Sequence, residues 1–265
     1  MTGSPIRIEL QVVSYVNMLC KSLNQVLAPA AKSLLSKIEL VCNMIELSDT
    51  GMNIIKQSIG NGPLQWVTQD YKNYGNNVTL PNAVTSVNIP VPAKFNSLNS
   101  LFFSFRMNSA GVATFQALES NKFKLEEYFL RVGSRTMPVK PPNTSAEFYS
   151  ELLRGFGTVT DVNQECSISI EQYTKDIPVA IAAGEASQQT GGFYIGVDLE
   201  SYSNTSNDTI YSGTNTSTDD IFGVLRFGAQ TLANGNAATY NVRIDSYALY
   251  DQLVLIQNGN CTVNY

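Results

Sequence analysis

Residues 239–258, TYNVRIDSYALYDQLVLIQN, decide the fold class. Between Tyr240 and Ile244 apolar and polar residues alternate, and this period of two gives a strand one apolar and one polar face. After Asp251 the alternation stops and residues 253–256 form a short continuous apolar run, which is typical of a strand buried on both faces. The segment therefore predicts a half-buried strand that leads into a core strand.

The same signature occurs far upstream, in residues 36–47, SKIELVCNMIEL. Its Lys37-Ile38-Glu39 matches Arg243-Ile244-Asp245, because in each case a base, an isoleucine and an acid lead into a small residue and a second apolar stretch. Two β-units that each end in the same strand would produce this repeat, and chance is the alternative. We favour the repeat, which predicts a strand over residues 37–47.

Composition narrows the function classes. The chain has 265 residues, 43% of them hydrophobic, which is ample for a packed core. Its net charge of −5 and its scattered lysines and arginines argue against direct nucleic-acid binding, which needs clustered positive charge. The sequence has no histidine, so Ser-His-Asp and Cys-His catalysis and nearly all zinc enzyme sites are excluded.

The cysteines and the first residues indicate a reducing compartment. Cys20, Cys42, Cys166 and Cys261 are widely spaced without a CxxC pair, so we expect reduced, buried thiols rather than a metal site. The N-terminal residues lack the pattern of a signal peptide, and no apolar run is long enough to predict a membrane span.

Periodicity predicts mostly strands. Two helices are expected, one over residues 52–59 with Ser48 as N-cap and Gly60 as stop, and one that begins with the Thr144/Glu147 capping box. Strands are expected over residues 5–13, 37–47, 64–74, 83–91, 98–106, 127–132, 193–199, 221–227 and the closing segment, with an alternating stretch at 166–170. From about residue 63 we count eight strands, which is typical of a jelly roll, two four-stranded antiparallel sheets packed face to face. Residues 108–121 and 200–220 are polar and are expected to be exposed loops.

No catalytic, cofactor or metal residue is predicted, and the chain is not expected to be an enzyme. Alternation sends the acid pair Glu126-Glu127 to opposite faces of a strand, and Asp219-Asp220 lies in the polar loop. A Ca²⁺ site using Asp208, Asp219 or Asp220 is a weak alternative without EF-hand spacing.

The aromatic residues have two interpretations. Most are expected in the core rather than in a ligand groove: Phe102, Phe103, Phe105, Tyr128 and Phe129. Tyr194 and Tyr202 beside the polar loop suit stacking on a sugar, and half-buried strand ends explain them equally well.

Several segments in combination resemble the second barrel of double jelly-roll major capsid proteins. They are YFLRVGSRTMPVKPPNTSAEFYSELLRGFG (128–157), FYIGVDLESY (193–202), SGTNTSTDD (212–220) and the closing RIDSYALYDQLVLIQNG. PIRIELQ, KIELVCNMIELSD and LFFSFR also resemble family segments. The likeness is greatest to the capsid proteins of virophages, Polinton-like elements and adintovirus-type viruses, in the wider adenovirus-hexon lineage.

This resemblance implies an all-β fold in two parts. Residues 1–60 would be the C-terminal strands and helix of a partial first jelly roll, and residues 61–265 a complete second jelly roll.

The family forms trimers that give pseudo-hexagonal capsomers of an icosahedral shell. The implied partners are therefore the chain itself as a homotrimer, neighbouring capsomers, and penton or minor capsid proteins. The implied location is the virion, with synthesis in the host cytoplasm or nucleus. The alternative is a monomeric, lectin-like carbohydrate-binding or attachment module.

Overall fold

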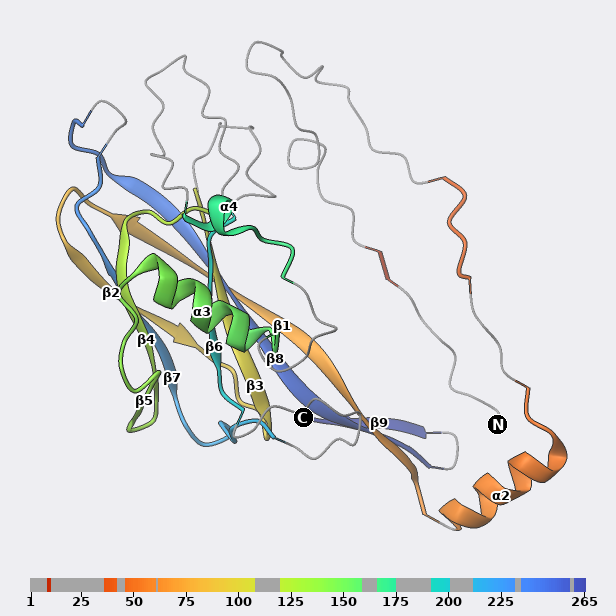
Figure 1. Cartoon of the computed structure of the whole chain (residues 1–265). Helices are drawn as coiled ribbons and strands as arrows, with labels where there is room; N and C mark the ends of the chain where they lie inside the picture. The colour runs from red at the N-terminus through yellow and green to blue at the C-terminus, as the bar shows by residue number, and fades with distance from the viewer. Residues whose placement is uncertain are drawn as a thin grey trace.

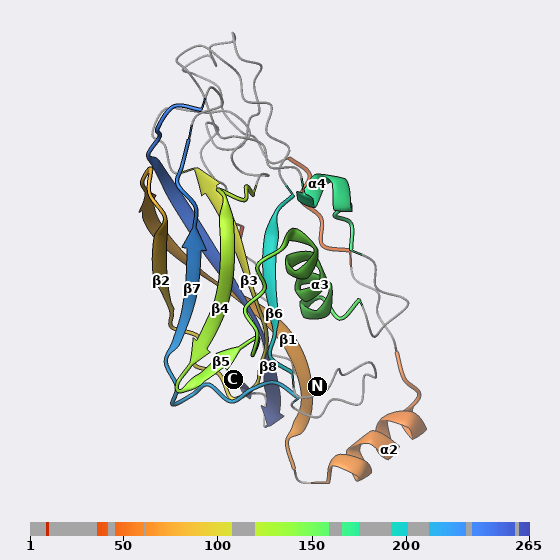
Figure 2. The same ribbon diagram turned by 60° about the vertical axis from the view of Figure 1, so that its left-hand side comes forward.

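The structure, a computed structural model, consists mainly of two antiparallel β-sheets packed face to face (Figures 1 and 2). It describes residues 9–10, 36–41, 46–60, 62–107, 120–158, 166–174, 192–200, 212–231, 235–257 and 260–265.

The two sheets divide the strands in a fixed order. The first sheet has the order β1-β8-β3-β6, with β9 also paired to β8, and the second has the order β2-β7-β4-β5. The strands of the first sheet are β1 (Leu64–Leu80), β3 (Leu98–Met107), β6 (Tyr194–Asp198), β8 (Tyr240–Gln257) and β9 (Asn260–Asn264). Those of the second are β2 (Thr85–Val91), β4 (Leu125–Val132), β5 (Arg135–Met137) and β7 (Ile221–Phe227). Apart from the β4–β5 hairpin, every connection from β1 to β8 crosses between the sheets, which is the jelly-roll arrangement. The predicted fold class is confirmed.

The core lies between the sheets and is rich in aromatic residues. Leu101, Phe103 and Phe105 point inward from β3, as the alternation predicts, and are fully buried. Phe102 points to the outer face of β3 and is also buried, because it stacks on Phe156 with ring centroids 4.7 Å apart. The aromatic residues assigned to the core are therefore buried, except Phe129, which is half-buried.

Both predicted helices are present. α2 (Asp49–Ile59) begins at Ser48, whose Oγ accepts a hydrogen bond from Gly51 N at 3.3 Å, and ends at Gly60, where φ is +59°. α3 (Ser145–Gly155) begins at Thr144, whose Oγ1 accepts from Glu147 N at 3.2 Å. α3 covers β6 on the outer side of the first sheet (Figure 2), with Phe148 and Leu152 buried beneath it.

A third described helix begins in the stretch 166–170, where apolar and polar residues alternate. α4 (Ile170–Thr174) starts at the last residue of this stretch and the other residues are irregular, so the stretch is not a strand. None of the described helices is long and apolar enough to cross a membrane.

The upstream strand predicted over residues 37–47 is not formed in its described part. Residues 36–41 and 46–48 have no regular structure, and Ile38, Leu40 and Val41 are between 63% and 85% exposed. The pattern of a strand is present, but these residues have no sheet to join within the described chain. Of the strand predicted over residues 5–13, only 9–10 are described, and these two are not in a strand.

The closing segment is one continuous strand, β8, rather than two consecutive strands. Its apolar end, residues 253–256, was expected to be buried on both faces, but only Val254 is buried and the others are half-exposed. The reason is geometric: β8 and β1 extend beyond the described strands of the second sheet, so none of those strands covers their ends (Figure 1).

Candidate functional site: the loop anchor and the strand extension

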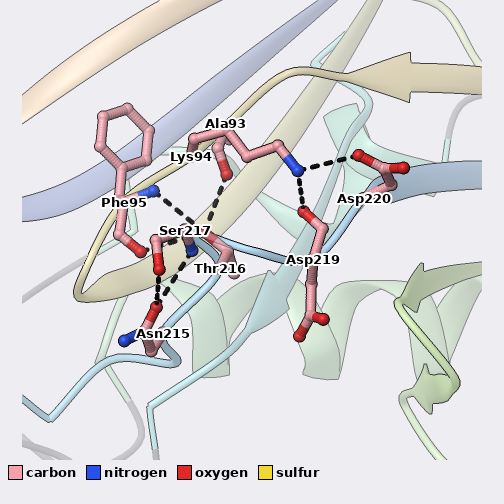
Figure 3. Close-up of polar contacts among 8 residues, drawn as sticks. All are labelled: Ala93, Lys94, Phe95, Asn215, Thr216, Ser217, Asp219 and Asp220. Atoms are coloured by element: carbon pink, nitrogen blue, oxygen red, sulfur yellow. Dashed lines mark hydrogen bonds and ion pairs between the residues drawn. The ribbon is translucent and has the colours of Figure 1, made fainter.

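The polar segment 212–220 is anchored on the sandwich rather than exposed throughout. Thr216 is completely buried, and its hydroxyl accepts a hydrogen bond from Phe95 N at 3.2 Å and donates one to Ala93 O at 2.8 Å (Figure 3). Thr216 N also donates to Phe95 O at 2.8 Å. The prediction of a wholly exposed loop is therefore wrong for this part, because hydroxyl and backbone groups satisfy one another inside the fold. Residues 201–211 lie outside the described chain.

The start of the same segment packs tightly on the first residues of β3. Thr214 and Leu98 exchange two backbone hydrogen bonds of 2.9 Å. A Cβ at Gly213 would lie 2.4 Å from Asn99 Oδ1 and 2.7 Å from Leu98 C, so only glycine fits here without displacement. Gly213 N donates to Ser97 Oγ at 3.1 Å.

Ser97 joins residues 212–220, which we call the loop anchor, to a buried carboxylate, Asp251 of β8. Asp251 accepts hydrogen bonds from Ser97 Oγ at 2.6 Å, Asn99 Nδ2 at 2.7 Å and Gln69 Nε2 at 3.2 Å, and it is 1% exposed. A buried carboxylate is tolerated only when donors surround it, and here all three are neutral side chains. The network ties β1, β3, β8 and the loop anchor together at one end of the sandwich.

Asp219 and Asp220 do not form a cation site with described residues. Lys94 Nζ donates to Asp219 O at 2.6 Å and to Asp220 Oδ1 at 2.8 Å (Figure 3). The lysine hydrogen bond and charge lower the pKa of Asp220. Asp208 lies outside the described residues, and in the described part of the chain no three potential metal ligands cluster.

Glu126 and Glu127 turn toward the same partner, contrary to the prediction of opposite faces. The pairing of β4 with β7 shifts register between Leu125 and Glu127, so Glu126 occupies a β-bulge. The two carboxylates lie 3.5 and 3.9 Å from the Arg226 guanidinium, respectively. All three side chains are partly exposed, so the cluster is a surface ion-pair group rather than an acid–base site.

Of the two tyrosines considered for stacking on a sugar, Tyr194 and Tyr202, the structure describes only Tyr194. Tyr194 is half-buried on β6, where its carbonyl accepts a hydrogen bond from Tyr173 Oη at 2.9 Å, and burial raises the pKa of its hydroxyl. Tyr202 lies outside the described residues. The described part therefore supports the strand-end interpretation for Tyr194.

A charged group that periodicity placed on the polar face of β8 is in fact buried. Asp245 is 0% exposed beneath two arginines: Arg243 Nε lies 2.8 Å from its Oδ1, and Arg106 pairs with its Oδ2. The contact between Arg243 and Asp245 could be predicted from the sequence, because residues two apart in a strand lie on the same face. The contact with Arg106 could not, because it depends on the pairing of β3 with β8.

The second feature of this end is the strand extension, which we define as residues 64–68 of β1, residues 252–257 of β8, and β9. β3 and β9 pair with the same edge of β8, β3 with residues 242–250 and β9 with residues 253–257. The paired residues place Trp66, Val254 and Val263 in one row and Leu64, Ile256 and Cys261 in the next, on the face that continues the core side of the sheet. Trp66 and Val263 are each 43% exposed. Val254 at the centre is buried, so the face is a partly exposed apolar surface within the described structure.

The two described cysteines differ from the expectation of buried thiols. Cys261 is exposed on the strand extension, Cys166 is half-buried, and both are free. Cys20 and Cys42 lie outside the described residues.

Comparison with known proteins identifies structures but no sequence family. No family model matches the chain, and no curated protein sequence matches it. The chain is similar to the crystal structure of PBCV-1 VP54 fitted into a cryo-electron microscopy reconstruction of the virophage Sputnik, and to a chain in a quasi-atomic model of the PBCV-1 virus capsid. Each has 11% identity and a TM-score of 0.45, covering 80% of this chain and 54% of the other. It is also similar to a chain of the Sputnik virophage structure, with 13% identity and a TM-score of 0.41, covering 76% of this chain and 39% of the other. The chain therefore spans about half the length of the solved structures it matches. The first and third of these structures belong to reconstructions of the virophage Sputnik, and the second is of the PBCV-1 virus capsid.

Proposed function

We propose that this chain is a subunit of a viral major capsid protein that self-assembles, as trimers, into pseudo-hexagonal capsomers of an icosahedral shell. The observation that carries the proposal is the strand order β1-β8-β3-β6 facing β2-β7-β4-β5. The segments that resemble capsid proteins contribute β4, β5, α3, β6, the loop anchor and β8 to this one jelly roll.

The physical properties of the fold suit a shell protein. A shell needs stiff subunits with self-complementary surfaces, and it needs no catalytic group. The aromatic core and the buried Asp251 network make the sandwich rigid, while the strand extension leaves apolar surface for contacts between subunits. In this proposal the chain is not an enzyme.

The domain assignment remains part of the proposal. Residues 1–60 would belong to a partial first jelly roll and residues 61–265 to the second. Partners would be further copies of the chain, neighbouring capsomers, and penton or minor capsid proteins, without direct nucleic-acid contact. The protein would be located in the virion after synthesis in the host cytoplasm or nucleus.

Light scattering on the purified chain, with negative-stain images of the same peak, tests the proposal. A mass of three 29.0 kDa chains and a hexagonal outline are expected. A monomer at every concentration would contradict it. Glycan binding by that monomer would instead favour the lectin-like alternative.

A further inference from the structure

The last described strand, β9, has little burial to hold it on the sandwich. It pairs with β8 through five residue pairs, and all five of its residues are exposed. Burial of apolar surface is the main term that keeps an element in place, and elements with few buried contacts open locally at a small cost in free energy. The attachment of β9 therefore depends on contacts beyond its own five residues.

The residue that follows β9 supplies such contacts. The ring of Tyr265 lies edge-on to two other rings, with centroid distances of 6.0 Å to Phe95 and 6.0 Å to Tyr250. Lys72 Nζ lies 5.8 Å from the centre of the Tyr265 ring, and Asn96 Nδ2 donates a hydrogen bond to Tyr265 O at 3.2 Å. Together these contacts fasten the end of β9 to β1, to β8 and to the turn before β3.

The surface that receives Tyr265 is continuous with the core. Phe95 and Tyr250 stack with ring centroids 3.8 Å apart, and they are 1% and 6% exposed. Tyr265 itself is 54% exposed, so its ring lies on this stack without entering the core. The contact can therefore be broken without unfolding the sandwich, because Tyr265 fills no space inside it.

The turn that receives Tyr265 also holds the loop anchor. Phe95 N donates a hydrogen bond to Thr216 Oγ1 at 3.2 Å, and Thr216 N donates one to Phe95 O at 2.8 Å. Asn96, the next residue of the turn, is the one that donates to Tyr265 O. A change at Tyr265 thus reaches the loop anchor through two consecutive residues.

We propose that β9 and Tyr265 form a latch with two positions. In the closed position, which the structure shows, Tyr265 lies on the Phe95–Tyr250 stack and β9 pairs with β8. In the open position Tyr265 leaves the stack and β9 leaves β8. Opening exposes both aromatic rings and the backbone edge of β8 at residues 253–257, and it loosens the turn that holds the loop anchor. The latch goes beyond the proposed capsid function and does not rest on it.

Hydrogen exchange of the full chain, measured by mass spectrometry, tests the latch. Tyr265→Ala removes two aromatic contacts and should make the open position about tenfold more populated. Exchange should therefore rise about tenfold in β9, in residues 253–257 of β8, in the turn at residues 93–97 and in the loop anchor, while the rest of the sandwich is unchanged. Tyr265→Phe retains the ring and should exchange like the wild type.

The comparison needs a matched control and a constant state of association. Tyr71→Ala serves as the control, because Tyr71 is a 57% exposed tyrosine of β1 outside the latch contacts. All samples are measured at a dilution at which light scattering gives them the same mass, because association also protects strand edges. Unchanged exchange of β9 in Tyr265→Ala would overturn the latch. Faster exchange of β9 without faster exchange at residues 93–97 would overturn its connection to the loop anchor.

A reversible covalent lock separates the role of the ring from that of the strand. Ile256 pairs directly with Cys261 of β9, so Ile256→Cys places two thiols opposite each other, within reach of a disulfide on mild oxidation. In the oxidised double variant Ile256→Cys/Tyr265→Ala, β9 should exchange slowly again, whereas residues 93–97 should still exchange fast because the ring is absent. Reductant should restore fast exchange of β9. Slow exchange of the turn in the oxidised double variant would overturn the role of Tyr265, because β9 alone would then hold the turn.

Discussion

Replacing Asp251 with alanine should destabilise the sandwich more than any other single change to a polar residue at this end. Its carboxylate accepts hydrogen bonds from Ser97, Asn99 and Gln69, and the first two of these donors are themselves buried. A hydrogen bond to a charged group contributes about 1.5–3 kcal/mol, and a buried donor left unsatisfied costs about 1–3 kcal/mol. The lost hydrogen bonds and the unsatisfied donors belong to the same contacts, so their contributions cannot simply be added. We therefore expect the free energy of unfolding to fall by about 3–5 kcal/mol.

Urea unfolding followed by far-ultraviolet circular dichroism measures this loss. The midpoint should fall without a change in slope, and all samples need one protein concentration because self-association also shifts stability. Asp251→Asn should lose about half as much as Asp251→Ala, because the amide retains one acceptor oxygen. Asp220→Ala is the control: its carboxylate is exposed, so its midpoint should stay near that of the wild type.

A double-mutant cycle measures whether Ser97 and Asp251 stabilise the fold through their shared hydrogen bond. Ser97→Ala and Asp251→Ala should couple by more than about 0.5 kcal/mol, because the two side chains share a hydrogen bond of 2.6 Å. Additive effects, or an Asp251→Ala variant within about 1 kcal/mol of the wild type, would show that the network does not stabilise the fold.

Three further predictions concern the loop anchor and α3. Gly213→Ala should lower the unfolding free energy by about 1–3 kcal/mol, because its Cβ would overlap Leu98. Gly51→Ala, where only ordinary contacts are met, should not lower it, and equal losses in both would refute the steric argument. Thr216→Val should cost about 1–3 kcal/mol in urea unfolding through loss of its buried hydroxyl, while Thr216→Ser should recover most of it; no recovery would contradict the assigned hydrogen bonds. The pKa of Glu147 is lowered from 4.5 to about 2, first by the hydrogen bond from Asn143 N and then by Lys140. Its stabilisation of the fold is therefore present above pH 4.5 and is lost as the pH falls toward 2; an NMR titration showing an ordinary pKa would contradict this.

Strand periodicity predicted much of the fold because burial on one face imposes a period of two. β3, β6 and β7 lie where alternation and apolar runs placed them, and the capping box at Thr144 located α3. The short strands β5 and β9 were missed. β5 has only three residues and β9 only five, too few to show a clear period, and β9 is entirely exposed.

The misses at the candidate site have a common physical cause, which is pairing between distant segments. The alternation stops after Asp251, yet this residue lies inside β8, where Asn99 of β3 and Ser97 of the turn before β3 donate hydrogen bonds to its carboxylate. Thr216 is buried because the backbone at Phe95 offers it a donor. The sequence of one segment does not reveal which residues of a distant segment will pack against it.

The central claim is that this jelly roll is a capsid subunit, and cryo-electron microscopy of the associated protein tests it most directly. The account predicts three copies around an axis in a hexagonal outline, each with the strand order β1-β8-β3-β6 facing β2-β7-β4-β5. Particles without three-fold symmetry, or isolated monomers that bind glycan at the loop anchor, would contradict it.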